Sequence, residues 1–170
     1  MKHRAASIVR LAALLGLAGL GSAGALAEED LRRLTEDARR TASQILGQIR
    51  GEVTKELERT GPIRAIVVCK YSAPEITSAV SRQAGMRVTR VALRVRNPAL
   101  GEADAWEQSA LLEFEKRLAK GEKIETLEAA ELVNEPVGKM FRYAKAIPMG
   151  QPCLACHGPV AGLSDAVRAQ

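Results

Sequence analysis

The sequence predicts an α+β domain, because a long helical pattern near one end of the chain is followed by alternating patterns typical of strands. Apolar residues recur every three or four positions over residues 29–59, interleaved with charges, as in an amphipathic helix. After Gly85 the period changes to two, and residues 88–96 alternate apolar with mostly basic side chains. Two further strand-like runs, 123–133 and 139–147, flank a turn-like Asn-Glu-Pro-Val-Gly sequence.

Shorter helices are expected between these patterns. A Thr-Gly-Pro sequence ends the first helix, and Pro62 suits the first turn of a short apolar helix that reaches Cys69. A further helical piece covers residues 73–83. A second amphipathic helix follows Asp104, an acid that suits a helix N-terminus, and ends at Gly121.

The first 27 residues have the pattern of a secretory signal peptide that is cleaved. Three basic residues precede a short apolar stretch, 11–20, and an Ala-Leu-Ala sequence ends at Ala27, just before an acidic cluster. The apolar stretch is well short of the roughly 20 residues that a spanning helix needs, which disfavours an uncleaved membrane anchor. We therefore expect a periplasmic protein with no stable membrane span after cleavage, in which residues 28–170 form a single domain.

Cleavage also changes the charge balance. The whole chain has 25 basic and 20 acidic residues, whereas the chain after Ala27 has 22 basic and the same 20 acidic residues. It also leaves His157 as the only histidine. No basic patch interleaved with aromatic residues is present, so nucleic acid is a poor candidate partner. About 143 residues remain, which is enough for one domain with its own core.

The most specific functional pattern is the Cys-Leu-Ala-Cys-His sequence at residues 153–157. This C-x-x-C-H box is typical of covalent attachment of a c-type haem. Cys153 and Cys156 would each form a thioether with a haem vinyl group, and His157 would be the proximal iron ligand. Such attachment takes place outside the bacterial cytoplasm, in agreement with the signal peptide. The sequence therefore predicts one covalent haem c.

Two other interpretations use the same cysteines. A zinc site built from Cys69 and the box has the right number of ligands, although the adjacent Cys156 and His157 are awkward as two corners of one tetrahedron. A redox dithiol also has C-x-x-C spacing, but no βαβ pattern follows the box, which lies near the end of the chain.

The residues alone leave the second axial position open. With no other histidine after cleavage, the candidates are Cys69, a methionine, a lysine, or no residue. Met86, Met140 and Met149 each lie in or beside an apolar run and are typical core fillers. Cys69 is also the odd cysteine of an exported protein, which is compatible with a reactive thiol, an intermolecular disulfide or a buried inert side chain.

Several short sequences together carry a family resemblance. They are Ala-Ile-Val-Val-Cys ending at Cys69 with the Ala-Pro-Glu-Ile that follows, Val-Arg-Asn-Pro at 95–98, Asp-Ala-Trp-Glu at 104–107, and the box with its following glycine. In these features the chain resembles the bacterial periplasmic haem-c domain family with a PAS-like fold, long catalogued as a domain of unknown function. The resemblance implies a PAS-like antiparallel sheet with flanking helices. It also implies a His/Cys-ligated haem iron, with His157 proximal and Cys69 distal.

Two details accompany this resemblance. Family members usually continue past the haem box into a further helix and a closing strand, so a chain that ends at Gln170 is expected to lack the C-terminal strand or to be a fragment. Arg96 has two interpretations, a solvated basic face or a partner of a haem propionate, since a guanidinium matches a carboxylate bidentately.

Three functions were compared on these grounds. A six-coordinate His/Cys haem favours electron transfer or redox sensing with a partner protein that the sequence does not identify. The alternative is a gas sensor in which CO or NO displaces Cys69. An enzyme such as a peroxidase is disfavoured, because no distal histidine is available for acid–base chemistry. The long N-terminal helix could pack on its own domain or pair with a second copy in a homodimer.

Overall fold

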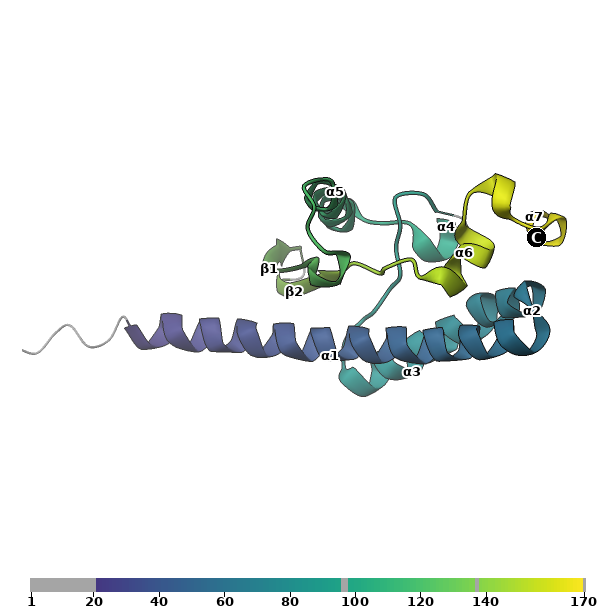
Figure 1. The fold of residues 1–170 in the computed structure, drawn as a ribbon. Coiled ribbons are helices and arrows are strands. Elements are labelled where there is room, and N and C mark those ends of the chain that lie inside the picture. The colour runs from purple at the N-terminus through teal and green to yellow at the C-terminus, as the bar shows by residue number, and fades with distance from the viewer. Residues whose placement is uncertain (1–20, 96–97, 137, 170) are drawn as a thin grey trace, which may run out of the picture.

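The computed structural model describes residues 21–95, 98–136 and 138–169. Most of the expected signal peptide, together with Arg96, lies outside these described residues. No described helix is both long enough and apolar enough to cross a membrane. Figure 1 shows a long helix along the length of the molecule, with one helix on one side of it and the remaining elements on the other.

The long helix, α1 (Gly21–Thr60), confirms the expected amphipathic pattern. Ala38, Ile45 and Ile49 lie on its apolar face and are buried. The rest of the main apolar core comes from α3 (Ala73–Ala84), which packs beneath α1 through Ala73 and Val80. Helix α1 also contacts η1 and α6, the two elements that contain the cysteines.

Short helices complete the half of the molecule around the end of α1. They are α2 (Pro62–Val67), the π-helical turn η1 (Val68–Ser72), α4 (Pro98–Gly101), α6 (Gln151–His157), the 3₁₀ turn η3 (Val160–Gly162) and α7 (Asp165–Arg168). The expected helices at 62–69 and 73–83 are thus present, with η1 joining them. In Figure 1, α4 and α6 lie near each other above this half of α1.

The other half of the molecule contains α5 and a β-hairpin. Helix α5 (Ala105–Ala119) begins with a capping box: the Glu107 N–H donates to Asp104 Oδ1 over 2.9 Å, and the Asp104 N–H donates to Glu107 Oε2 over 2.9 Å. Asp104 is therefore the helix-starting acid that the sequence predicts. After the 3₁₀ turn η2 (Ile124–Thr126), β1 (Glu128–Glu135) pairs antiparallel with β2 (Gly138–Lys145).

The predicted strand at 88–96 is wrong for the described residues 88–95, which form an irregular extended segment. Its half-buried apolar residues, Val88, Val91 and Val95, are spaced by three and four rather than two. Val88 packs against the α1–α3 core, and the Ala92 N–H donates to the Gly101 carbonyl over 3.2 Å. The segment thus contacts helices, and not the neighbouring strand that the alternation predicted.

The described residues therefore form an α+β fold in which helices predominate. Its sheet has two strands, β1 and β2, and the broad fold class agrees with the sequence prediction. Side chains from both neighbouring helices hold the hairpin. The Arg39 Nε of α1 donates to Glu128 Oε2 over 3.0 Å, and the Trp106 Nε1 of α5 donates to Glu131 Oε2 over 2.9 Å.

Candidate functional site

The C-x-x-C-H box lies on α6, which ends at His157. Cys153 and Cys156 are three residues apart, so they project from one face of the helix. Both are half-buried, whereas Leu154 and Ala155 between them are exposed. The helix therefore directs the two sulfurs to the same side, as attachment of one planar ligand requires.

The end of α6 is fixed by its backbone. The Gly158 N–H donates to the Leu154 carbonyl over 3.0 Å. A Cβ atom at Gly158 would lie 2.6 Å from that carbonyl oxygen, so this position requires glycine. The constraint stops the helix immediately after His157 and leaves the imidazole on an exposed residue at the helix end.

Helix α6 packs against other helices in its half of the molecule. It contacts α1 and α2, and α7 also contacts α2. The segment that leads into α6 is tied to α1, because Arg50 Nη2 donates to the Pro148 carbonyl over 2.8 Å. Residues about 100 positions apart in the sequence thus place the box near the α2–η1 segment.

Cys69 lies in η1, on the same side of the molecule as the box. Its residue reaches solvent, yet partial burial is the main cause that raises the pKa of its thiol. The charge of Arg90 lowers the pKa of this thiol, and the charges of Cys156 and Cys153 raise it. Helix α6 contacts α2, and α2 leads directly into η1, so Cys69 lies in the same part of the molecule as the box.

The structure therefore places three predicted site residues, Cys69, Cys153 and Cys156, on neighbouring elements in one half of the molecule. Arg90 is a neighbour of Cys69 that sequence reasoning missed, since its place in an alternating basic run suggested only a solvated face. His157 follows directly on the same helix. Arg96 lies outside the described residues, so its interaction with a propionate stays a prediction.

The methionines differ in their distance from this cluster. Met140 lies on β2, in the hairpin, which Figure 1 shows away from α6. Met149 lies immediately before α6 and is 50% exposed. Met86 follows α3 and is half-buried. Position alone therefore leaves Met149 as the methionine that competes most directly with Cys69 for an iron near the box.

The zinc interpretation needs four ligands that converge on one point. Within the described residues, no three His, Cys, Asp or Glu side chains are close enough together to hold a metal ion. Cys69, Cys153, Cys156 and His157 all belong to that described part of the chain. The residues thus do not form the tetrahedral zinc site considered above.

Large apolar side chains are exposed around the cysteines. Leu154 and Met149 lie on or beside α6, and Val67 and Tyr71 flank Cys69 in sequence. Leu100 of α4 is 63% exposed and Val160 of η3 is 70% exposed. Exposed apolar groups are ordinary when single, but a set of them around one site is typical of a surface that a ligand or partner covers.

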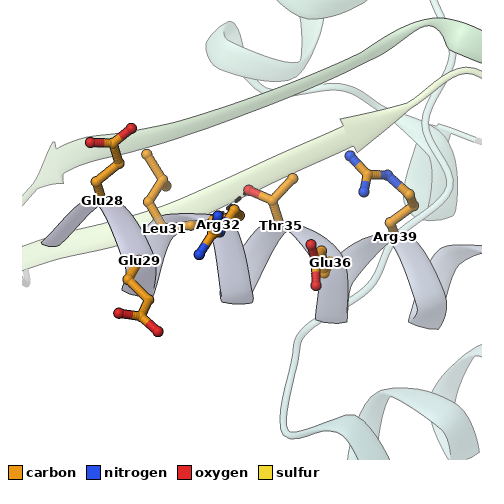
Figure 2. Close-up of a pocket in the computed structure, with 7 residues that line it drawn as sticks. All are labelled: Glu28, Glu29, Leu31, Arg32, Thr35, Glu36 and Arg39. Carbon is orange, nitrogen blue, oxygen red and sulfur yellow. Dashed lines mark hydrogen bonds between the residues drawn. The ribbon is translucent and has the colours of Figure 1, made fainter. Parts of the chain in front are cut away.

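A groove on α1 is a separate feature. Its lining comes from the part of α1 near the hairpin: Glu28, Glu29, Leu31, Arg32, Thr35, Glu36 and Arg39. In Figure 2, Glu28, Leu31 and Arg39 point toward the strands, and Glu29 points away from them. The Thr35 hydroxyl donates to the Leu31 carbonyl over 2.8 Å, within the helix. The groove has no cysteine or histidine in its lining, so it does not extend the cysteine cluster.

Comparison with known families gives a match over most of the chain. Residues 28–169 match the Tll0287-like family, described as Tll0287. The chain belongs to the Tll0287-like family. No curated protein and no solved structure matches it. The matched range of this Tll0287-like chain contains Cys69, Cys153, Cys156 and His157, so all the gathered site residues belong to the family domain.

Proposed function

We propose that this Tll0287-like protein is a periplasmic c-type cytochrome that carries one covalent haem and acts in electron transfer or redox sensing. The observation that carries the proposal is the Cys-Leu-Ala-Cys-His box on α6, a helix that contacts α2 just before the segment with Cys69. The box accounts for covalent attachment and the proximal ligand, and Cys69 provides the thiol for the opposite side of the iron. The resemblance to the haem-c family supports the same ligand pair.

The residues around the cluster fit a haem by their chemistry. A porphyrin is a large apolar plane, and the exposed apolar side chains near α6 and η1 would be buried against it. Its propionates are negatively charged, whereas residues 61–101 contain seven basic residues and one acidic residue. The site thus offers thiols, an imidazole, apolar contacts and positive charge, which together match the groups of a haem c.

The chain's own residues have separate roles in this proposal. Cys153 and Cys156 anchor the group through two thioethers, and His157 holds the iron from the α6 side. Cys69 would hold the iron as a thiolate; burial raises the pKa of the free thiol, and the positive charge of Arg90 opposes that shift. A bound haem supplies a one-electron redox couple, and a thiolate ligand favours the ferric state.

We also infer the finer features of the fold from the family resemblance. The β1–β2 hairpin would belong to a PAS-like antiparallel sheet, and the flanking helices would cover it. Export through the signal peptide at residues 1–27 would bring the chain to the compartment where haem c is attached. Both inferences rest on sequence patterns, and a crystal structure of the exported, haem-loaded protein tests both.

The experiment that tests haem attachment is expression with a cytochrome c maturation system. We expect one haem that stays with the protein through acid–acetone extraction. Cys153→Ser or Cys156→Ser should lower or abolish the covalent haem, whereas Cys69→Ala should retain it. Stoichiometric zinc with no Soret absorption band in the wild-type protein would contradict the proposal.

The role of Cys69 is tested by optical and EPR spectra of the loaded protein. The oxidised wild type should be low-spin with thiolate-type EPR, and its potential should lie well below that of a His/Met cytochrome. Cys69→Ala should give high-spin iron that binds cyanide readily. Met149→Leu is the matched control and should leave the spectra unchanged. The reverse pattern would assign the ligand to Met149 instead.

The same samples separate electron transfer from gas sensing. Reduction should weaken the iron–thiolate bond, since ferrous iron holds a thiolate less tightly. If the ferrous wild-type protein keeps its protein ligands and binds no CO, electron transfer or redox sensing is favoured. Rapid CO binding at a rate similar to that of Cys69→Ala would instead favour the gas sensor, because Cys69 would then leave the iron without a barrier.

A further inference from the structure

The helical segment that carries Cys69 contains a local change of helix type. Helices α2 and α3 are joined directly by η1, a five-residue π-helical turn. At its end the Ala73 N–H donates to the Val68 carbonyl, five residues earlier, instead of four. Such wide turns are rare, and they occur frequently at functional sites. Cys69 lies within this one.

The burial pattern shows what the wide turn does. Ala65 is buried before it and Val68 at its first residue, and Ala73, Thr77 and Val80 are buried after it. The step from Val68 to Ala73 is five residues, whereas every other step is three or four. In a regular α-helix residues five apart point about 140° apart, because each residue turns the helix by about 100°. Because of the π turn, the buried residues of α2 and those of α3 lie on the same side of the continuous helical segment.

Pro74 provides a physical cause for the turn. A proline has no N–H to donate to the carbonyl four residues earlier, which here belongs to Lys70, and in a regular helix its ring clashes with that carbonyl. One extra residue in the preceding turn moves the carbonyl away from the ring. Pro74 lies at the start of α3, directly after the π turn. The position of the turn therefore matches the position of the steric conflict.

We propose that Pro74 is a positioning residue: it imposes the π turn and thereby directs Cys69 toward the C-x-x-C-H box. The inference rests on the proposed ligation of iron by Cys69. Burial of Ala73, Thr77 and Val80 fixes α3 against α1, so conversion of η1 to regular α-helix would rotate the preceding residues. The rotation would approach the roughly 100° of one residue and would turn Cys69 away from the box.

The test uses the haem-loaded protein with Pro74→Ala, in which residue 74 regains its N–H. Alanine is a strong helix former, so the variant should fold, and Pro74→Ser provides a second substitution with the same N–H. We expect loss of most of the low-spin thiolate signal with covalent haem retained. Pro62→Ala is the matched control, because Pro62 occupies the first turn of α2, where a missing N–H has no effect on the helix.

Alkylation of Cys69 gives a second measurement that does not depend on spectra. In the loaded protein the other two cysteines are thioethers, so iodoacetamide reacts with Cys69 alone. Iron should protect this thiol in the wild type and in Pro62→Ala, and Pro74→Ala should react several-fold faster. Unchanged spectra and unchanged alkylation in both Pro74 variants would overturn the proposal.

A crystal structure of loaded Pro74→Ala separates this inference from the proposed function. If Cys69→Ala leaves the wild-type spectra unchanged, the ligation is wrong, and the backbone geometry still tests the role of Pro74. The Ala73 N–H should then donate to the Cys69 carbonyl, four residues earlier, with Cys69 turned away from the box. Retention of the bond to Val68 in the absence of proline would overturn the role of Pro74.

Discussion

The two halves of the molecule along α1 differ in how their charged side chains are paired and in how far their apolar side chains are buried. In the hairpin half, Arg142 forms ion pairs with Asp104 and with Glu135, the latter over 3.2 Å, and its guanidinium lies 4.9 Å from the centre of the Trp106 ring. In the box half, residues 61–101 and 146–170 together contain eight basic but only two acidic residues. Its apolar side chains are also more exposed.

This difference indicates which half depends on a further component. The hairpin half pairs several of its charges internally and buries Leu127 completely. The box half has surplus positive charge and exposed apolar groups beside three thiols. The proposed haem, with its apolar ring and anionic propionates, would match the exposed apolar groups and the positive charge of this half. The comparison therefore supports the proposed cofactor independently of the box motif.

The largest expected effect is on hydrogen exchange in the box half. Haem attachment should slow amide exchange in α2, η1 and α6 by about a hundredfold, because burial of a few apolar side chains contributes about 3 kcal/mol. Exchange in β1 and β2 should change far less. Mass spectrometry of peptides from the loaded protein and from Cys153→Ser measures both. Equal protection of the two halves in the unloaded chain would contradict the comparison.

The second prediction concerns Leu127, whose side chain is fully buried. Leu127→Ala should lower the free energy of unfolding by about 3 kcal/mol, since it leaves a cavity in the hairpin half. Covalent haem should still form. The matched control is Leu154→Ala in the box half, where the side chain is 38% exposed and the unloaded chain should lose less than about 1 kcal/mol. Urea unfolding of each variant beside the wild type in the same haem-loading state provides the measurement.

The third prediction concerns Arg142, which links α5 with both strands. Arg142→Ala should destabilise the protein by about 1–2 kcal/mol, through loss of the stacking on Trp106 and of the ion pairs. Arg142→Lys keeps the charge but loses the flat guanidinium, so it should have an intermediate effect. Urea unfolding checks the order of the three proteins. A lysine variant as stable as the wild type would show that charge alone matters.

Elements with strong local patterns could be predicted from the sequence. The apolar period of α1, the turn between β1 and β2 and the capping pair Asp104–Glu107 each depend on residues close together in the chain. Such features agree with the structure because local and tertiary preferences coincide there.

The features that could not be predicted depend on contacts between residues far apart in the sequence. Residues 88–95 alternate like a strand, yet no strand is available beside them in the described residues, and helices contact their apolar groups instead. The position of Arg90 beside Cys69 follows from that course of the chain. The π turn corresponds to one local pattern, a five-residue step from Val68 to Ala73, just before Pro74. This step can be recognised only when the buried residues are known.

The smallest effect is expected from Glu128, which accepts hydrogen bonds from Arg39 and from Tyr143 Oη, the latter over 2.8 Å. The hydrogen bond from Arg39 is the main cause that lowers the pKa of Glu128 from 4.5 to about 2, although burial opposes it. The ionised carboxylate therefore stabilises the fold above pH 4.5, and this contribution is lost as the pH falls through about 2.

Glu128→Gln removes this dependence and tests whether the paired charges of the hairpin half contribute to stability. The melting temperature at pH 7 should fall by about 2–4 °C, a small change because the Arg39–Glu128 pair remains accessible to solvent. Between pH 4.5 and 2 the wild type should lose this advantage, so that the two melting curves converge. Glu113→Gln removes a similar charge from the exposed surface of α5 and should not reproduce the convergence. A difference between wild type and Glu128→Gln that persists unchanged at pH 2 would show that shape, rather than charge, holds the hairpin to α1.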